Sequence, residues 1–178
     1  YSEHARRYLK ASSVAPQRTY VSGSPMAEVL HENLEEIKNS NVFERLNAKL
    51  AEQPTANSQQ LKLEKGKYIL LSAHREENID TEKNFNSLFT AINKMAEKYD
   101  MPILYSCHPR SRNRLAASGF QLDPRVIQHE PLGFHDYNCL QMNAFAVVSD
   151  SGTLPEESSF FSSVGHPFPA VCIRTSTE

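Results

Sequence analysis

Histidine and arginine side chains follow two apolar segments of this chain. The segment YILLS (68–72) leads into a polar run that contains His74 and Arg75, and the segment ILYSC (103–107) leads into His108. Imidazole and guanidinium groups can donate hydrogen bonds to an anion such as a phosphate. The plain alternative is that each polar run is a solvated loop. We favour an anion site because such apolar runs are typical of buried parallel strands, and ligands bind beyond the ends of these strands.

A third apolar segment, FAVVS (145–149), is followed by a turn that could hold a diphosphate. Ser151 or Thr153 can cap the helix that we expect after this segment, and Gly152 would let a ligand approach the backbone closely. Free amides at a helix start attract anions, and a glutamate one or two turns further on could accept hydrogen bonds from a ribose. The alternative is an ordinary capped helix with acidic residues in its first turns.

Two aromatic residues, Phe134 and Tyr137, lie between a predicted strand and a predicted helix. Such residues usually pack in a core, but they could also form a stacking platform for a flat base. The six glycines of the chain build neither GxGxxG nor GxxxxGK[ST]. The candidate residues therefore indicate a nucleotide-diphosphate site without a P-loop.

The elements that must position these residues alternate along the chain. Strands are predicted at 19–22, 68–72, 103–107, 126–129, 145–149 and 170–173. Helices are predicted at 2–10, from Pro25 onward, and at 81–99, 111–118, 136–143 and 153–161. This alternation predicts an α/β fold with a Rossmann-like parallel sheet and helices on both faces.

Length and composition indicate one folded domain. The chain has 178 residues, of which 22% are charged, and domains commonly contain about 100–200 residues. The mostly polar residues 48–65, which include Pro54, are predicted to form a mobile surface loop. The net charge of −2 argues against a nucleic-acid partner, because a nucleic-acid groove needs a basic face.

Several features bear on the cellular setting of the chain. No apolar run approaches the roughly 18 residues of a membrane span, and we see no secretory leader. Cys107, Cys139 and Cys172 are far apart and form no CxxC, so we expect no disulfide framework or zinc ribbon and a cytoplasmic location. The chain opens at Tyr1 and ends at Glu178 just after a predicted strand, so we expect a fragment of a longer protein.

Seven motifs lie in order along nearly the whole chain. They are EHARRYL (3–9), SGSPMAEVL (22–30), SAHREEN (72–78), CHPRSRNRL (107–115), PLGFHDYNCLQMNA (131–144), SDSGTLPEE (149–157) and CIRTSTE (172–178). In order and spacing they resemble the carboxyl-terminal half of the non-hydrolysing UDP-N-acetylglucosamine 2-epimerase family. The variants HREEN, CHPRSRNRL and DSGTLPEESS look most like the branch that makes UDP-N-acetyl-L-fucosamine, with a UDP-2-acetamido-2,6-dideoxy-hexose as substrate.

The resemblance implies one half of a two-domain glycosyltransferase-B-type fold, whose active site lies in the cleft between Rossmann-like domains. Residues 1–178 would form the UDP-binding carboxyl-terminal domain. The amino-terminal domain and the final helices would be absent. The carboxylates that serve the family as acid and base belong to that absent domain, and a homodimer is also implied.

The resemblance carries a UDP site over to matching positions. Ser151 and Gly152 should bind the diphosphate at the helix start. Glu157 should hold the ribose hydroxyls, with Glu156 as the alternative. Arg174 matches a family arginine near the cleft.

Further roles follow from the same resemblance. Tyr137 matches the aromatic residue that stacks on uracil, and Phe134 should frame the edge of the base. His74 should lie near the diphosphate and the hexose and take part in catalysis. Arg75 and His108 match positions that contact a second UDP-sugar, an activator, in regulated members.

The implied reaction inverts C2 of a UDP-N-acetylhexosamine by elimination of UDP to a 2-acetamido-glycal and re-addition. It would supply precursors of cell-surface polysaccharides, and it implies no metal and no cofactor. Two alternatives remain at this point. One is a UDP-sugar glycosyltransferase of the same fold, and the other is a non-catalytic nucleotide-binding module.

Overall fold

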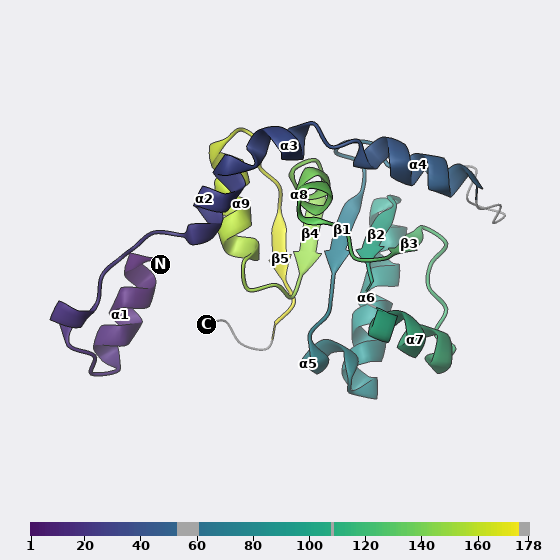
Figure 1. The fold of residues 1–178 in the computed structure, drawn as a ribbon. Coiled ribbons are helices and arrows are strands. Elements are labelled where there is room, and N and C mark those ends of the chain that lie inside the picture. Colours follow the sequence, from purple (N-terminus) through teal and green to yellow (C-terminus); the bar gives the residue numbers. More distant parts are fainter. Residues whose placement is uncertain (53–60, 108, 175–178) are drawn as a thin grey trace.

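The computed structural model describes residues 1–52, 61–107 and 109–174 (Figure 1). In this part of the chain, five parallel strands form one sheet in the order β3-β2-β1-β4-β5. They are β1 (Ile69–Ser72), β2 (Ile103–Ser106), β3 (Val126–His129), β4 (Ala146–Ser149) and β5 (Ala170–Cys172). These strands lie where the sequence predicts them, within one residue at either end.

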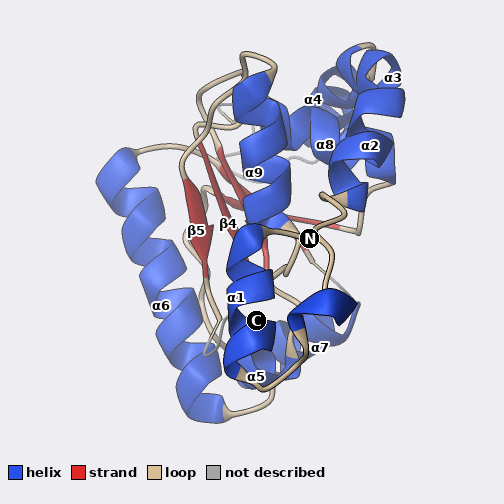
Figure 2. Ribbon diagram, turned by 90° about the vertical axis from the view of Figure 1, so that its left-hand side faces the viewer, coloured by secondary structure: helices blue, strands red, loops and turns tan. Residues whose placement is uncertain are grey.

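Most of the helices flank the sheet, while the first two lie apart from it. The helices are α1 (Glu3–Ala11), the short 3₁₀ helix η1 (Pro16–Arg18), α2 (Pro25–Glu32), α3 (Leu34–Lys38), α4 (Val42–Glu52), α5 (Glu76–Ile79), α6 (Glu82–Tyr99), α7 (Pro109–Ser118), α8 (Phe134–Met142) and α9 (Leu154–Ser163). Figure 2 shows α6 on one side of the sheet, with α8 and α9 on the other. The predicted α/β fold with helices on both faces is therefore confirmed. None of the described helices is long and apolar enough to cross a membrane.

The sheet separates two apolar clusters. Tyr68 and Leu70 belong to the cluster beneath α2, α3, α4, α8 and α9, whereas Ile69 and Leu71 belong to the cluster beneath α6 and α7. All four side chains are at most 2% exposed. Successive strand residues point to opposite faces, so a strand covered on both faces needs apolar residues at every position. This packing explains the unbroken apolar run at 68–71.

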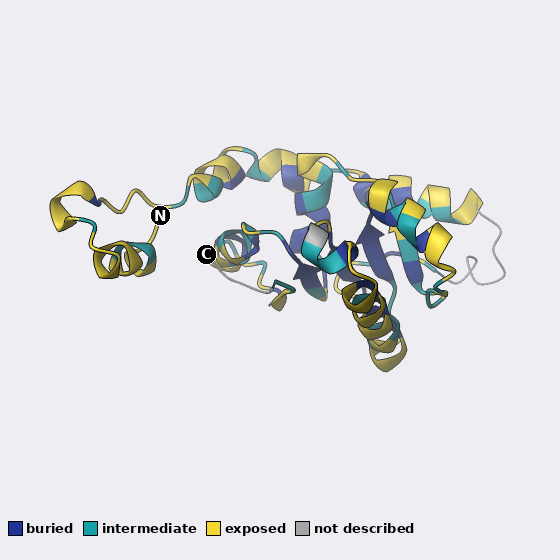
Figure 3. Cartoon of the chain, turned by 90° about the horizontal axis from the view of Figure 1, so that it is seen from below, coloured by how far each residue is buried: buried dark blue, intermediate teal, exposed yellow. Residues whose placement is uncertain are grey.

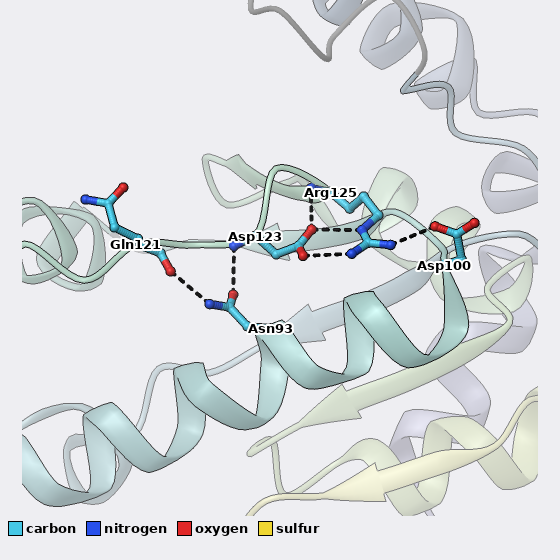
Figure 4. Close-up of polar contacts among 5 residues, drawn as sticks. All are labelled: Asn93, Asp100, Gln121, Asp123 and Arg125. Atoms are coloured by element: carbon cyan, nitrogen blue, oxygen red, sulfur yellow. Dashed lines mark hydrogen bonds and ion pairs between the residues drawn. The ribbon is translucent and has the colours of Figure 1, made fainter.

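Helix α6 covers one face of the sheet and connects to β3 through polar contacts. Asn93 on α6 accepts a hydrogen bond from the backbone N–H of Asp123 and donates one to the carbonyl of Gln121 (Figure 4). The Arg125 backbone N–H and guanidinium make three hydrogen bonds to the Asp123 carboxylate, and the guanidinium forms an ion pair with Asp100, the left-handed C-cap of α6. These contacts set the entry of β3 against the end of α6.

The first 24 residues lie apart from the sheet. Helix α1 contributes no buried residue of its own, and Figures 1 and 3 show it standing away from the other elements. The strand predicted at 19–22 is wrong, because these residues form an irregular segment between η1 and α2. Tyr20 and Val21 are 87% and 41% exposed, and the structure places no strand beside them among the residues it describes. An apolar run becomes a strand only where a partner supplies hydrogen bonds.

The loop predicted at 48–65 is wrong at both of its ends. Residues 48–52 continue α4, while 53–60 lie outside the described residues. Leu63 is 2% exposed and belongs to the core. Its backbone N–H donates to Asn47 Oδ1 at 2.8 Å, and Asn47 Nδ2 donates to its carbonyl at 3.0 Å. A polar composition is equally typical of the solvent face of a helix, so composition alone misplaced the start of this loop.

Candidate functional site

A cavity of about 310 Å³ lies beyond the carboxyl ends of β1 and β4. The strand order reverses between these two strands, and open α/β sheets bind ligands at such a switch point. The lining residues come from the end of β1 and the loop after it, the turn after β4, and α8 and α9. They are Ser72, His74, Arg75, Tyr137, Asp150, Ser151 and Glu157. Five of the predicted site residues are therefore brought together.

The loop after β1 is held to the end of β4 by one carboxylate. Asp150 Oδ2 accepts hydrogen bonds from the backbone N–H groups of His74 and Arg75, each at 2.8 Å. The Arg75 Nε also donates to the carbonyl of Asp150 at 2.9 Å. Asp150 is only 3% exposed, whereas His74 is exposed at the cavity. The arrangement places an imidazole and a guanidinium beside the turn after β4.

Asn78 joins the segment after β5 to the same carboxylate. Its Nδ2 donates to Asp150 Oδ2 at 3.0 Å and to the carbonyl of Ile173 at 2.9 Å. Arg174 follows directly, and its Nη1 lies 3.2 Å from the point where a Cβ on Gly152 would stand. Gly152 is not among the described glycines with positive φ. The absence of a side chain at Gly152 therefore leaves the space in which Arg174 lies against the turn.

The turn after β4 leads into the amino terminus of α9. Ser151 Oγ lies 2.9 Å from Thr153 Oγ1 and accepts a hydrogen bond from the Thr153 N–H at 3.3 Å. The Ser151 N–H donates in turn to Ser149 Oγ at 3.0 Å. Thr153 is the N-cap of α9, and Pro155 has no N–H to donate. The positive end of the helix dipole thus lies beside Ser151 at the cavity, an environment that favours an anion.

Glu157 presents its carboxylate to the cavity between α8 and α9. Its Oε1 accepts a hydrogen bond from Thr153 Oγ1 at 2.6 Å, and its Oε2 accepts one from Gln141 Nε2 at 2.7 Å. Gln141 is fully buried on α8. Glu156 instead accepts a hydrogen bond from Ser24, the N-cap of α2, and is not among the lining residues. Geometry therefore favours Glu157 over Glu156 as a ligand-binding group.

The two aromatic residues of α8 lie in different surroundings. Tyr137 lines the cavity together with Ser72, which stands at the end of β1. Burial raises the pKa of Tyr137 to about 12, and the negative charge of Glu157 adds to the rise. Phe134 is 38% exposed, lies edge-on to His135 and does not line the cavity. The base-stacking roles stay predictions.

The basic run after β2 contacts neighbouring segments. Arg110 makes an ion pair with the Asp80 carboxylate at 2.9 Å, and Arg114 donates to the Asp80 carbonyl at 2.7 Å. Arg112 lies 3.5 Å from Glu130. His108 lies outside the described residues, so its activator-binding role stays a prediction.

Three polar residues at the site escaped the sequence reasoning. Asp150 had one signal, because it is the first polar residue after an apolar strand and precedes the glycine turn. No feature of the sequence pointed to Asn78 or Gln141, since their partners, Ile173 and Glu157, lie on other elements. Among the residues that the structure describes, no three His, Cys, Asp or Glu side chains are grouped so as to hold a metal ion.

Comparison with known proteins identifies relatives that match all or much of the chain. The model of the family described as "UDP-N-acetylglucosamine 2-epimerase" matches residues 1–178. The UDP-N-acetylglucosamine 2-epimerase of Methanocaldococcus jannaschii is 25% identical over 182 residues, which cover 99% of this chain and 45% of that protein. The UDP-2,3-diacetamido-2,3-dideoxy-D-glucuronate 2-epimerase of Pseudomonas aeruginosa is 31% identical over 111 residues, or 62% of this chain and 29% of that protein.

Solved structures show the same fold. The M. jannaschii enzyme in complex with UDP-GlcNAc and UDP superposes with a TM-score of 0.78 at 22% identity, covering 99% of this chain and 44% of that one. The UDP-N-acetylglucosamine 2-epimerase of Rickettsia bellii gives a TM-score of 0.77 at 31% identity, covering 99% and 42%. The chain thus spans less than half the length of each of these relatives.

Proposed function

The chain belongs to the UDP-N-acetylglucosamine 2-epimerase family, and we propose that it forms the UDP-binding half of an enzyme that inverts C2 of a UDP-N-acetylhexosamine. The observation that carries the proposal is the cavity at the switch point between β1 and β4. The cavity joins a helix amino terminus, a histidine and an arginine to a carboxylate held on α9, and these groups suit a diphosphate beside a ribose.

Each part of the nucleotide has a matching group. The diphosphate lies at Ser151 and the Gly152 turn, with Arg174 against that turn. The ribose hydroxyls donate to Glu157, whose two oxygens are already oriented by Thr153 and Gln141. Such orientation lowers the entropy cost of binding. Tyr137 and the segment that begins at Phe134 frame the uracil.

The reaction begins by breaking the bond between C1 and the diphosphate oxygen. The proton on C2 is removed, UDP leaves with the bonding electron pair, and a 2-acetamido-glycal forms. UDP then adds back to C1 while C2 receives a proton on its opposite face. The charge on the departing diphosphate is stabilised by the α9 amino terminus and by the cationic side chains already at the site. His74 lies beside the diphosphate and the hexose. The acid and base of the family lie in the other half of the protein.

Two finer assignments belong to the proposal. The motif variants HREEN and DSGTLPEESS support the UDP-N-acetyl-L-fucosamine branch, whose substrate is a UDP-2-acetamido-2,6-dideoxy-hexose. Arg75 and His108 contact a second UDP-sugar as activator. Arg75 lines the cavity proposed for the first UDP, so a second UDP-sugar in contact with Arg75 would lie next to that cavity.

Calorimetry tests the nucleotide site. We expect the 178-residue chain to bind UDP weakly and to bind uridine still more weakly, because uridine lacks the diphosphate. A folded chain that shows no UDP binding would overturn the site assignment.

Solvent exchange tests the reaction. We expect the chain alone to show no epimerisation, since the proposed acid and base lie elsewhere. Joined to the rest of its protein, it should place deuterium from D₂O at C2 of the sugar. A glycosyltransferase would leave C2 unlabelled and transfer the sugar to an acceptor. Comparing UDP-N-acetylglucosamine with its 6-deoxy analogues identifies the branch.

A further inference from the structure

The backbone of the loop after β1 is held from both sides by buried side chains, one on β2 and one just after β4. On one side, the Tyr105 hydroxyl of β2 donates to the carbonyl of Ala73 at 3.3 Å. On the other, Asp150 accepts from the N–H groups of His74 and Arg75. We propose that Asp150 and Tyr105 are positioning residues that fix His74 and Arg75 for nucleotide binding. This inference rests on the proposed function.

Burial makes these contacts strong constraints. Ala73 and Tyr105 are fully buried, and Asp150 is 3% exposed. A buried carboxylate is costly unless hydrogen-bond donors surround it, and Asp150 Oδ2 has three of them. Buried backbone N–H groups are equally costly without an acceptor. The carboxylate and the loop therefore stabilise each other in one arrangement.

The same carboxylate sets the position of the segment after β5. Asn78 donates both to Asp150 and to the carbonyl of Ile173, and the Ile173 N–H donates to the carbonyl of Ser149. Arg174 follows Ile173 and lies against the Gly152 turn. The loop after β1 and the segment after β5 thus both depend on Asp150.

Tyr105 can affect the ligand only indirectly. It does not line the cavity, and its contact with the loop is made through the carbonyl that precedes His74. Any effect of Tyr105 on nucleotide affinity must therefore pass through the position of the loop. This separation makes Tyr105 a sharper probe of the inference than Asp150, which lines the cavity itself.

Amide hydrogen exchange of the unliganded chain tests the positioning directly. We expect Asp150→Ala to speed exchange at the N–H groups of His74 and Arg75 by about tenfold or more, because both lose a charged acceptor. Asp150→Asn keeps an acceptor oxygen and should restore most of the protection. Unchanged exchange at these two amides in a folded Asp150→Ala protein would overturn the inference. This measurement does not depend on UDP binding, so it separates the inference from the proposed function.

A matched pair of tyrosine variants tests the consequence for binding and covers the case in which Asp150→Ala does not fold. Tyr105→Phe should weaken UDP binding by about threefold to tenfold. Tyr68→Phe removes another buried hydroxyl, which donates to the carbonyl of Leu140, and should lower the melting temperature without changing UDP affinity. Equal losses of affinity in both variants, or none in Tyr105→Phe, would overturn the positioning role. If the wild-type chain binds no UDP, the proposed function fails, and exchange at His74 and Arg75 in Tyr105→Phe still decides the positioning.

Discussion

Glu156 and Glu157 are neighbours on α9, yet their carboxylates contact different helices. Glu157 accepts a hydrogen bond from Gln141 on α8, while Glu156 accepts one from Ser24 at the start of α2. Successive residues on a helix point about 100° apart, so one carboxylate faces the cavity and its neighbour faces α2. The pair thus separates a carboxylate that lines the cavity from one that packs against α2.

Glu157→Ala should weaken UDP binding by about 1–3 kcal/mol, because the ribose hydroxyls lose a charged acceptor. Calorimetry on the purified chain measures this loss. Glu156→Ala is the matched control: it removes the contact with Ser24 and should lower the melting temperature while UDP affinity stays the same. The reverse pattern, with affinity lost in Glu156→Ala alone, would assign the ribose to Glu156.

Gly152→Ala should weaken UDP binding, because the added methyl would lie 3.2 Å from Nη1 of Arg174 and push the guanidinium away from the turn. Gly133→Ala provides the control, since a Cβ there meets no atom within 4 Å. Gly133 is the N-cap of α8, with a φ of −65° that alanine also adopts. UDP titrations of both variants measure the effect. Equal affinity in the two would show that Arg174 does not contribute to binding.

The sequence predicted the sheet well because each strand carries a local signal. The apolar run at 68–72 reflects burial on both faces, and the polar residues after it lie at the edge of the sheet that carries the cavity. Prediction from the sequence failed at 19–22 and at 48–65. The structure of these segments depends on contacts between residues distant in the sequence, such as that between Asn47 and Leu63. Asp150 was missed for the same reason, since its partners precede it by more than 70 residues.

Tyr137 should titrate late, with a pKa near 12, because burial and the charge of Glu157 disfavour the phenolate. An unfolded tyrosine titrates near pH 10. The native state therefore keeps its proton while the unfolded state loses it, and the stability due to this group falls between about pH 10 and pH 12. Glu157→Gln removes one cause and should lower the pKa of Tyr137. NMR titration of the tyrosine ring carbons resolves this group from the others, and an unchanged pKa would mean that burial alone sets it.

Arg125→Ala should lower the free energy of unfolding at pH 7 by about 1 kcal/mol, because it removes the contacts with Asp123 and Asp100. Hydrogen bonds from Arg125 hold the pKa of Asp123 below its usual value. The unfolded state therefore binds a proton more readily, so the stabilisation is present above about pH 4 and is lost as the pH falls further. Urea unfolding at several pH values should show the difference between variant and wild type shrinking below pH 4.

The surface pair of Lys38 and Glu35 supplies the control for this last effect. Both side chains are well exposed, so Lys38→Ala should lower the free energy of unfolding by only about 0.3–0.5 kcal/mol at any pH between 5 and 8.

Arg125 lies before β3, at the amino-terminal edge of the sheet, while the cavity lies beyond the carboxyl ends of the strands. Arg125→Ala should therefore leave UDP affinity unchanged. A weaker nucleotide site in this variant would mean that the entry of β3 is coupled to the cavity across the sheet.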